Sequence, residues 1–284
     1  MPDAAQPALV AIGDLHVEAA ENRRFVERLR PAHERDWLIV CGDVGEIMAD
    51  VEWALTTLAR SFEKVIWVPG NHELWTTPAD AVQLRGDARY RHLVRYCRDL
   101  GIATPEDPYP VWSGPGGPVA VAPLFTLYDY SFGVNVAPSK RESLARAHAV
   151  GVVCSDELVL HPDPYASREQ WCRARVELTA ERLTAMAAEG LPSVLVGHFP
   201  LLAELTQALF HPEFAQWCGT LATADWHTRF RAQAVVYGHL HIPRSSVHDG
   251  VRFEEVSFGY PLERKRWGNR RAVPRRIVPA GGAE

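Results

Sequence analysis

The amino-acid sequence predicts an α/β fold in which buried strands alternate with helices along the chain. Five short apolar runs each end in Gly followed by Asp, Asn or His, which is typical of buried strands that deliver polar side chains to a loop. Charged segments lie between these runs, and their apolar residues recur at helical spacing. With 47% hydrophobic and 23% charged residues among 284, the composition is that of an ordinary globular protein.

The first part of the chain predicts repeated strand–helix units. The expected elements, in order, are strand 9–12, helix 18–29, strand 38–41, helix 51–62, strand 65–68, a helix within 81–100 and strand 119–125. The helices are predicted from apolar residues spaced along one helical face, such as Val51, Ala54, Leu55 and Leu58. Alternation of this kind is typical of an α/β arrangement.

The 126–164 segment interrupts the alternation, because it mixes aromatic residues with prolines and one short charged stretch. We interpret it as a lid near the site or as a surface insertion, and both remain open. The expected elements after it are helix 168–189, strand 194–196, helix 201–209, strand 235–237, a hairpin over 245–256 around Asp249-Gly250 and a solvated Arg-rich segment at 264–276. No linker is evident, so we expect a single domain over residues 1–284.

Charge and composition argue against several classes of protein. The net charge is −5, so the basic surface that nucleic-acid binders usually carry is not indicated, and no nucleic acid is expected as a partner. No apolar run is long enough to span a bilayer and the first residues do not resemble a signal peptide, so we expect a cytoplasmic protein with no membrane contact. The five cysteines form no C-x-x-C pair and are expected to be reduced thiols. The oligomeric state stays open.

The residues that follow the five apolar runs are all of types that bind metal ions. They are Asp14, His16, Asp43, Asn71, His198, His239 and His241. In extended chain, residues two apart point the same way, so Asp14 and His16 can face one site, as can His239 and His241. Mixed nitrogen and oxygen ligands suit Mn, Fe or Zn better than Mg or Ca. The pattern therefore predicts a metal site assembled from separate strand ends.

The same stretches resemble the five motifs of the calcineurin-like metallophosphoesterases. They read Gly-Asp-Leu-His at 13–16, Gly-Asp-Val-Gly-Glu at 42–46, Gly-Asn-His-Glu at 70–73, Gly-His at 197–198 and Gly-His-Leu-His at 238–241. The resemblance implies a four-layer αββα sandwich of two mixed sheets flanked by helices, with two divalent or trivalent ions at the strand ends. It also implies a division of the ligands: Asp14, His16 and His241 for the first ion, Asn71, His198 and His239 for the second, and Asp43 as the bridge.

Two metal ions about 3.5–4 Å apart can hold a bridging hydroxide and clamp a phosphate group, so the expected activity is hydrolysis of a phosphate ester. We expect His72 to protonate the leaving group as general acid and Glu46 to orient His72. A small phosphomonoester is the first candidate substrate. Alternatives are a phosphodiesterase acting on a cyclic nucleotide or similar diester, and a non-catalytic metal-binding scaffold. A nuclease would need a basic groove, which the net charge does not offer.

The chain departs from the family pattern after the second motif. Glu46 stands where Asp is usual, and Ile47 follows it where the phosphoprotein phosphatases of the family have Arg, which argues against a protein-phosphatase role. Substrate contacts must then come from elsewhere. The candidates are Trp75, Tyr128, Tyr130, Tyr260 and Arg264, with ordinary core packing as the alternative reading of Tyr260.

Overall fold

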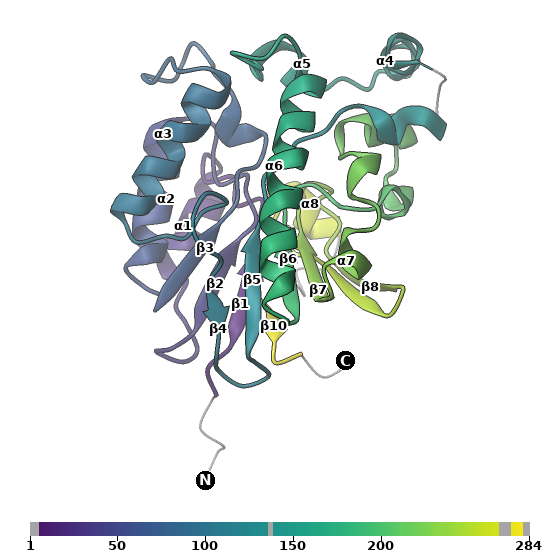
Figure 1. Ribbon diagram of the computed structural model, residues 1–284. Coiled ribbons are helices and arrows are strands. Elements are labelled where there is room, and N and C mark those ends of the chain that lie inside the picture. The colour runs from purple at the N-terminus through teal and green to yellow at the C-terminus, as the bar shows by residue number, and fades with distance from the viewer. Residues whose placement is uncertain (1–5, 136–138, 267–273, 281–284) are drawn as a thin grey trace.

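In the computed structural model, which describes residues 6–135, 139–266 and 274–280, the strands form two sheets that lie between layers of helices (Figure 1). One sheet has four strands and the other has six, and each contains parallel and antiparallel pairs. The predicted four-layer αββα sandwich of two mixed sheets is confirmed.

The first sheet joins the beginning of the chain to its last described strand. Its order is β10 (Arg275–Val278), β1 (Leu9–Ile12), β2 (Trp37–Val40) and β3 (Lys64–Trp67). Strands β1, β2 and β3 are parallel, and β10 pairs with β1 in the antiparallel sense. The segment 264–276, expected to be solvated, is mixed where the structure describes it. Lys265, Arg266 and Arg276 are exposed as expected, whereas Arg264 is buried and Arg275 begins β10; residues 267–273 lie outside the described residues.

The second sheet carries the later strands of the chain. Its order is β4 (Val111–Trp112), β5 (Val119–Pro123), β6 (Ser193–Val196), β7 (Ala232–Tyr237), β9 (Val251–Glu255) and β8 (Arg244–His248). The predicted hairpin is confirmed as β8 and β9. Its turn has φ +50° at Asp249 and +78° at Gly250, a left-handed pair that suits a tight hairpin with Asp-Gly.

Alternation along the strands divides the core into layers. In β1, Leu9 and Ala11 point into the apolar space between the two sheets, while Ile12 packs toward the helices outside. The first sheet is covered by α1 (Ala20–Arg28), α2 (Met48–Ala59) and α3 (Gly86–Asp99), and the second by α6 (Arg168–Ala188) and α7 (Trp226–Arg229) (Figure 1). These strands read as continuous apolar runs because both of their faces are buried.

The remaining elements lie in the connections. They are η1 (His72–Leu74), η2 (Ser131–Asn135), α4 (Lys140–Ala149), α5 (Asp156–Val159), η3 (Ala203–Ala208), η4 (Pro212–Trp217), η5 (Leu221–Thr223) and α8 (Pro261–Arg266). The α-helix expected at 201–209 is instead the 3₁₀ helix η3, whose turns close between residues three apart, such as the Leu209 N–H and the Thr206 carbonyl at 2.9 Å.

All five cysteines are free thiols, as predicted. Among the helices that the structure describes, none is both long and apolar enough to cross a bilayer.

Candidate metal centre

The candidate ligands lie at the carboxyl ends of strands from both sheets. Asp14 and His16 follow β1, Asp43 follows β2, Asn71 and His72 follow β3, His198 follows β6, and His239 and His241 follow β7. Parallel strands bring their carboxyl ends to the same edge of a sheet, and the face-to-face packing of the sheets brings the two edges together. Segments from Asp14 to His241 therefore meet in one place.

The backbone at five of the seven candidate ligands adopts a left-handed conformation. The φ angles are +51° at Asp14, +42° at His16, +50° at Asp43, +71° at His239 and +54° at His241. Such a conformation costs a non-glycine residue about 1–3 kcal/mol and clusters at functional sites. Here it turns the chain sharply after β1, β2 and β7, where these five ligands lie.

Two glycines leave room for the candidate carboxylates. A Cβ at Gly70 would lie 2.1 Å from Asp43 Oδ1, and a Cβ at Gly238 would lie 2.2 Å from Asp14 Oδ2. Any larger residue at either position would displace a carboxylate oxygen. The glycines before Asn71 and His239 are thus required by close approach to ligands from other strands.

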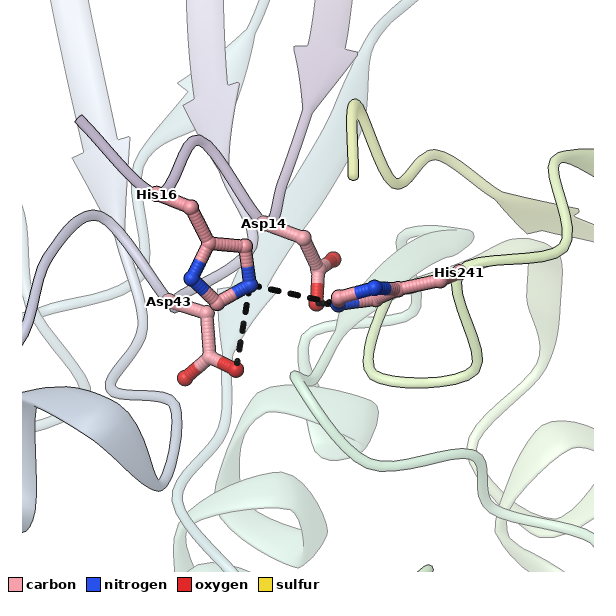
Figure 2. Close-up of side chains that lie close together, drawn as sticks. All are labelled: Asp14, His16, Asp43 and His241. Atoms are coloured by element: carbon pink, nitrogen blue, oxygen red, sulfur yellow. Dashed lines mark hydrogen bonds and ion pairs between the residues drawn. The ribbon is translucent and has the colours of Figure 1, made fainter. Parts of the chain in front are cut away.

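A first cluster contains Asp14, His16, Asp43 and His241, whose ligand atoms lie within 4.8 Å of one another (Figure 2). The Nε2 atoms of His16 and His241 are 3.2 Å apart. His241 Nε2 lies 3.1 Å from Asp14 Oδ1, and His16 Nε2 lies 4.0 Å from Asp43 Oδ2. These are the residues expected for the first ion and the bridge.

A second cluster joins Asp43 to His198 and His239. His198 Nε2 lies 3.4 Å from Asp43 Oδ2, 3.2 Å from His239 Nδ1 and 3.1 Å from Asn71 Oδ1. The other oxygen of Asp43, Oδ1, accepts the His72 backbone N–H at 2.9 Å. Oδ2 is therefore the Asp43 oxygen that lies near histidines of both clusters.

The spacing of these atoms fits metal ions. Bonds of about 2.0–2.2 Å from an ion to nitrogen or oxygen place neighbouring ligand atoms about 3.0–3.5 Å apart. The contacts of 3.1–3.4 Å around His198 and between His241 and its neighbours have that spacing. Nitrogen and oxygen atoms that converge at this spacing from the ends of separate strands are well suited to bind a cation together.

Contacts behind the clusters set which atom each candidate ligand presents. The Cys41 carbonyl oxygen lies 2.7 Å from His198 Nδ1, and Glu263 Oε2 lies 2.7 Å from His241 Nδ1. Each contact places the N–H on Nδ1, so the Nε2 lone pair faces the cluster. Asn71 donates its amide N–H to Asp156 Oδ1 at 3.0 Å, which leaves its carbonyl oxygen toward His198.

The two carboxylates are negatively charged at neutral pH. Burial raises the pKa of Asp14 and of Asp43, but the histidines outweigh it: His241 holds the pKa of Asp14 below its usual value, and His198 and His72 hold that of Asp43 well below. Both carboxylates are almost fully buried. Buried charges of this kind need cationic partners, and bound metal ions would supply them.

His72 lies against the clusters with its Nε2 directed inward. That atom is 3.8 Å from Asp43 Oδ2, and Nδ1 on the other side of the ring is 3.4 Å from Glu46 Oε1. Burial lowers the pKa of His72, but the charges of Asp43 and Glu46 outweigh it and raise the pKa above its usual value. Glu46, which is one methylene longer than the usual Asp, thus still places its carboxylate beside His72. The ring also stacks on Trp75, with centroids 3.7 Å apart.

Glu73 organises two of the loops without joining either cluster. Its fully buried carboxylate accepts the backbone N–H groups of Asp43, Val44 and Gly70, each at 2.9 Å. Burial, together with the charge of Asp43, raises the pKa of Glu73 to about 7. One side chain therefore connects the loop that carries Asp43 to the loop that carries Asn71.

A cavity of about 600 Å³ opens over the clusters. Its polar side includes Asp43, Asn71 and His72, and Trp75 and Tyr260 line it as candidate substrate contacts. Tyr260 also stacks on His16, with ring centroids 4.2 Å apart. Of the five residues proposed from the sequence for substrate binding, these two lie at the cavity.

The other three substrate candidates bond elsewhere in the protein. The hydroxyl of Tyr128 is 2.9 Å from Asp156 Oδ2, and that of Tyr130 is 2.7 Å from Glu157 Oε1. Arg264 donates to Asn22 Oδ1 and to the Gly259 carbonyl. All three are buried and none lines the cavity, which indicates a structural role for each.

Several residues at the site were not identified from the sequence. Glu73 lies in the Gly-Asn-His-Glu stretch at 70–73, but the motif assigns it no role. Asp156 lies in the 126–164 segment, where no strand or helix pattern points to the clusters. Leu209 and Phe214 line the cavity from the connection after β6. Glu263 lies three residues after Tyr260, and that proximity was the one signal that could have found it.

Comparisons with known proteins agree with this geometry. A family model described as calcineurin-like phosphoesterase matches residues 8–243. The chain is 53% identical over 262 residues to "[Acyl-carrier-protein] phosphodiesterase PptH" of Mycobacterium tuberculosis, covering 92% of this chain and 81% of that protein. The crystal structure of phosphopantetheinyl hydrolase (PptH) from Mycobacterium tuberculosis superposes with a TM-score of 0.94 at 50% identity over 99% of both chains. The protein TT1561 of Thermus thermophilus, with a TM-score of 0.50 at 12% identity over 88% of this chain and 89% of that one, is similar in fold alone.

Proposed function

Because this chain belongs to the calcineurin-like phosphoesterase family, we propose that it hydrolyses the phosphodiester that joins a phosphopantetheine group to an acyl carrier protein. The chain is a metal-dependent phosphoesterase. The observation that carries the proposed substrate is the 53% identity, over 92% of the chain, to a relative named an acyl-carrier-protein phosphodiesterase. A diester on a carrier protein thereby replaces a small phosphomonoester as the favoured substrate.

We assign the two groups of ligands as the resemblance implied. Asp14, His16 and His241 would hold one ion, Asn71, His198 and His239 the other, and Asp43 Oδ2 both. When bound, such ions neutralise charge on the phosphate and lower the pKa of water to make a nucleophile available at neutral pH. The first ion would have one carboxylate and two imidazoles of its own, and the second would have one amide and two imidazoles. Ligand sets of this mixed nitrogen and oxygen type favour Mn, Fe or Zn.

His72 would supply the proton that the leaving oxygen needs. The charges of Asp43 and Glu46 raise its pKa above the usual value, which favours the protonated form that a general acid needs, and Nε2 faces the same space as Asp43 Oδ2. Glu46 Oε1, 3.4 Å from Nδ1, would pair with the protonated ring and favour this orientation. For the proposed substrate, the leaving oxygen belongs to the carrier protein, since the phosphate departs with the pantetheine.

The cavity beside His239 suits an aliphatic arm. Val153, Leu209, Phe214 and Leu240, which we name the apolar wall, line it together. Phe214 stacks on His239 with ring centroids 5.8 Å apart, so the wall begins next to the second ligand cluster. A small polar monoester would leave this surface in contact with water, whereas a pantetheine chain could cover it. Because Val153 belongs to the 126–164 segment, its place in this wall supports a lid over a surface insertion, the two interpretations left open by the sequence.

The test is a direct assay with an acyl carrier protein that bears phosphopantetheine. Purified enzyme loaded with manganese should convert it to the unmodified protein, with the corresponding mass loss seen by intact-protein mass spectrometry. Cyclic nucleotides and small phosphomonoesters should be turned over far more slowly at equal concentration. Preferred turnover of a monoester, with no change in the carrier protein, would refute the proposal. Elemental analysis of the protein as purified would identify the ions.

A further inference from the structure

Asp156 is a buried carboxylate that reaches the metal centre from the 126–164 segment. It is the first residue of α5 and is 0% exposed. Its Oδ1 accepts from Asn71 Nδ2 at 3.0 Å and from Trp75 Nε1 at 2.6 Å, and its Oδ2 accepts the Tyr128 hydroxyl at 2.9 Å. Two of these three donors belong to the site.

The bond to Asn71 decides which end of that amide faces the second cluster. With Nδ2 held by Asp156, Oδ1 is directed to within 3.1 Å of His198 Nε2. An amide that turned by half a rotation would present its NH₂ group, which carries no lone pair for an ion. Asp156 thus selects the ligating orientation of Asn71.

The bond to Trp75 acts on the other half of the site. Trp75 is 8% exposed, and its ring lies 3.7 Å from that of His72 with an angle of 29° between the planes. Because Asp156 holds the indole N–H, it also fixes the surface on which the His72 imidazole rests. The same oxygen therefore supports a candidate ligand and the candidate general acid.

Asp156 is itself anchored to the long helix α6. Arg168, at the start of α6, donates to the Asp156 carbonyl at 2.5 Å and to Glu157 Oε2 at 3.1 Å. Arg168 also donates to the Leu160 carbonyl at 3.0 Å, so it holds α5 at both ends. The carboxylate is consequently presented from a fixed backbone.

We propose that Asp156 is a positioning residue that makes the 126–164 segment a structural part of the metal centre. This inference rests on the roles proposed above for Asn71 and His72. Removal of the part of the segment that contains Asp156 would therefore disturb the second ion as well as substrate preference. Residues that orient metal ligands in this way typically contribute about 10–100-fold to metal affinity or activity.

The experiment compares Asp156→Ala, Asp156→Asn and Tyr128→Phe. The alanine variant removes all three acceptor contacts, so the affinity for the second manganese ion should fall about 10–100-fold while the first ion stays bound. In the asparagine variant the carbonyl oxygen can still accept from Asn71 and Trp75, and its NH₂ can donate to the Tyr128 hydroxyl. That variant should keep both ions. Tyr128→Phe, the matched control, removes one donor without touching Asn71 or Trp75 and should also keep both.

Manganese binding is measured by equilibrium dialysis with elemental analysis, and folding by circular dichroism. Neither measurement needs a substrate, so the outcome is independent of whether an acyl carrier protein is hydrolysed. Two manganese ions bound with unchanged affinity in folded Asp156→Ala would overturn the inference. Loss of the second ion in folded Asp156→Asn would also overturn it, because the same contacts remain and only the charge has gone. Asp156→Leu, which is similar in size to Asp and also lacks an acceptor, carries the same expectation of a weakened second ion and replaces the alanine variant if that protein does not fold.

Discussion

Replacing Glu73 with alanine tests whether the loops of the site depend on one buried carboxylate. The side chain accepts three backbone N–H groups, from Asp43, Val44 and Gly70. Without it these donors are left buried and unpaired, because none of the three has another acceptor among the described residues. Glu73→Ala should therefore destabilise the protein and loosen the positions of Asp43 and Asn71.

The magnitude follows from the three bonds. A hydrogen bond to a charged acceptor contributes about 1.5 kcal/mol at the low end, so three amount to about 4.5 kcal/mol. Part of this is offset, because the carboxylate is costly to bury, as its raised pKa of about 7 indicates. We expect a net loss of about 3 kcal/mol in the free energy of unfolding. At about 2 °C per kcal/mol for a large chain, Tm should fall by about 6 °C.

Thermal unfolding followed by circular dichroism, with and without a chelator, measures the effect. The chelated samples report the hydrogen bonds alone, and manganese affinity measured separately reports the ligand positions. Glu73→Gln should show a smaller loss of stability. Its amide oxygen can still accept the backbone N–H groups of Asp43 and Gly70, whereas its NH₂ group would face the Val44 N–H, donor against donor. Glu177→Ala, on the exposed surface of α6, is the matched control. A Glu73→Ala protein with Tm within about 1 °C of this control would refute the reasoning.

Three other substitutions test the proposed roles at the site. Asp43→Asn should lose both ions or nearly all activity, by elemental analysis and rate assay; full activity with metal bound would contradict the bridging role. His72→Ala should keep the ions but slow turnover by about 10²–10⁴-fold for diesters with poor leaving groups and least for good ones, and an equal loss across leaving groups would count against a general acid. Phe214→Ser should raise KM for the phosphopantetheine-bearing carrier protein and leave a small aryl diester unaffected; equal effects on both would remove the apolar wall from substrate binding.

The candidate ligands were visible in the sequence because the signal is local. Each follows a buried run and a glycine within a few residues, as Asp14 does after residues 9–13. Parallel pairing then brings strand ends together without any further information about the chain between them. The seven ligand candidates consequently converge in the structure as the pattern predicts.

The contacts around the ligands could not be read in the same way. Asp156 and Asn71 are separated by 85 positions, and nothing in the sequence near Asp156 distinguishes it from a surface acid at the start of a short helix. Tyr128 looked like a substrate contact because it is an aromatic residue in an irregular segment, yet its hydroxyl is used by Asp156. Such pairings depend on how the 126–164 segment packs, which is a property of the whole fold.

The hydroxyl of Ser257 lies between Asp14 and a second acid, Glu255, which the sequence also left without a role. Ser257 Oγ is 2.7 Å from Asp14 Oδ2 and 2.5 Å from Glu255 Oε1. Burial raises the pKa of Glu255 to about 7. The strand β9, predicted only as half of a hairpin, therefore also supports the first ligand of the site.

The antiparallel pairing of β10 with β1 has a consequence for the synthesis of the protein. A chain emerges from the ribosome with its N-terminal end first. The edge of β1 that faces away from β2 therefore stays unpaired until β10, the last described strand, has been synthesised. An open strand edge of this kind can pair with other chains. We therefore expect nascent molecules stalled before Arg275 to need chaperone protection, and shortened forms without β10 to aggregate during expression.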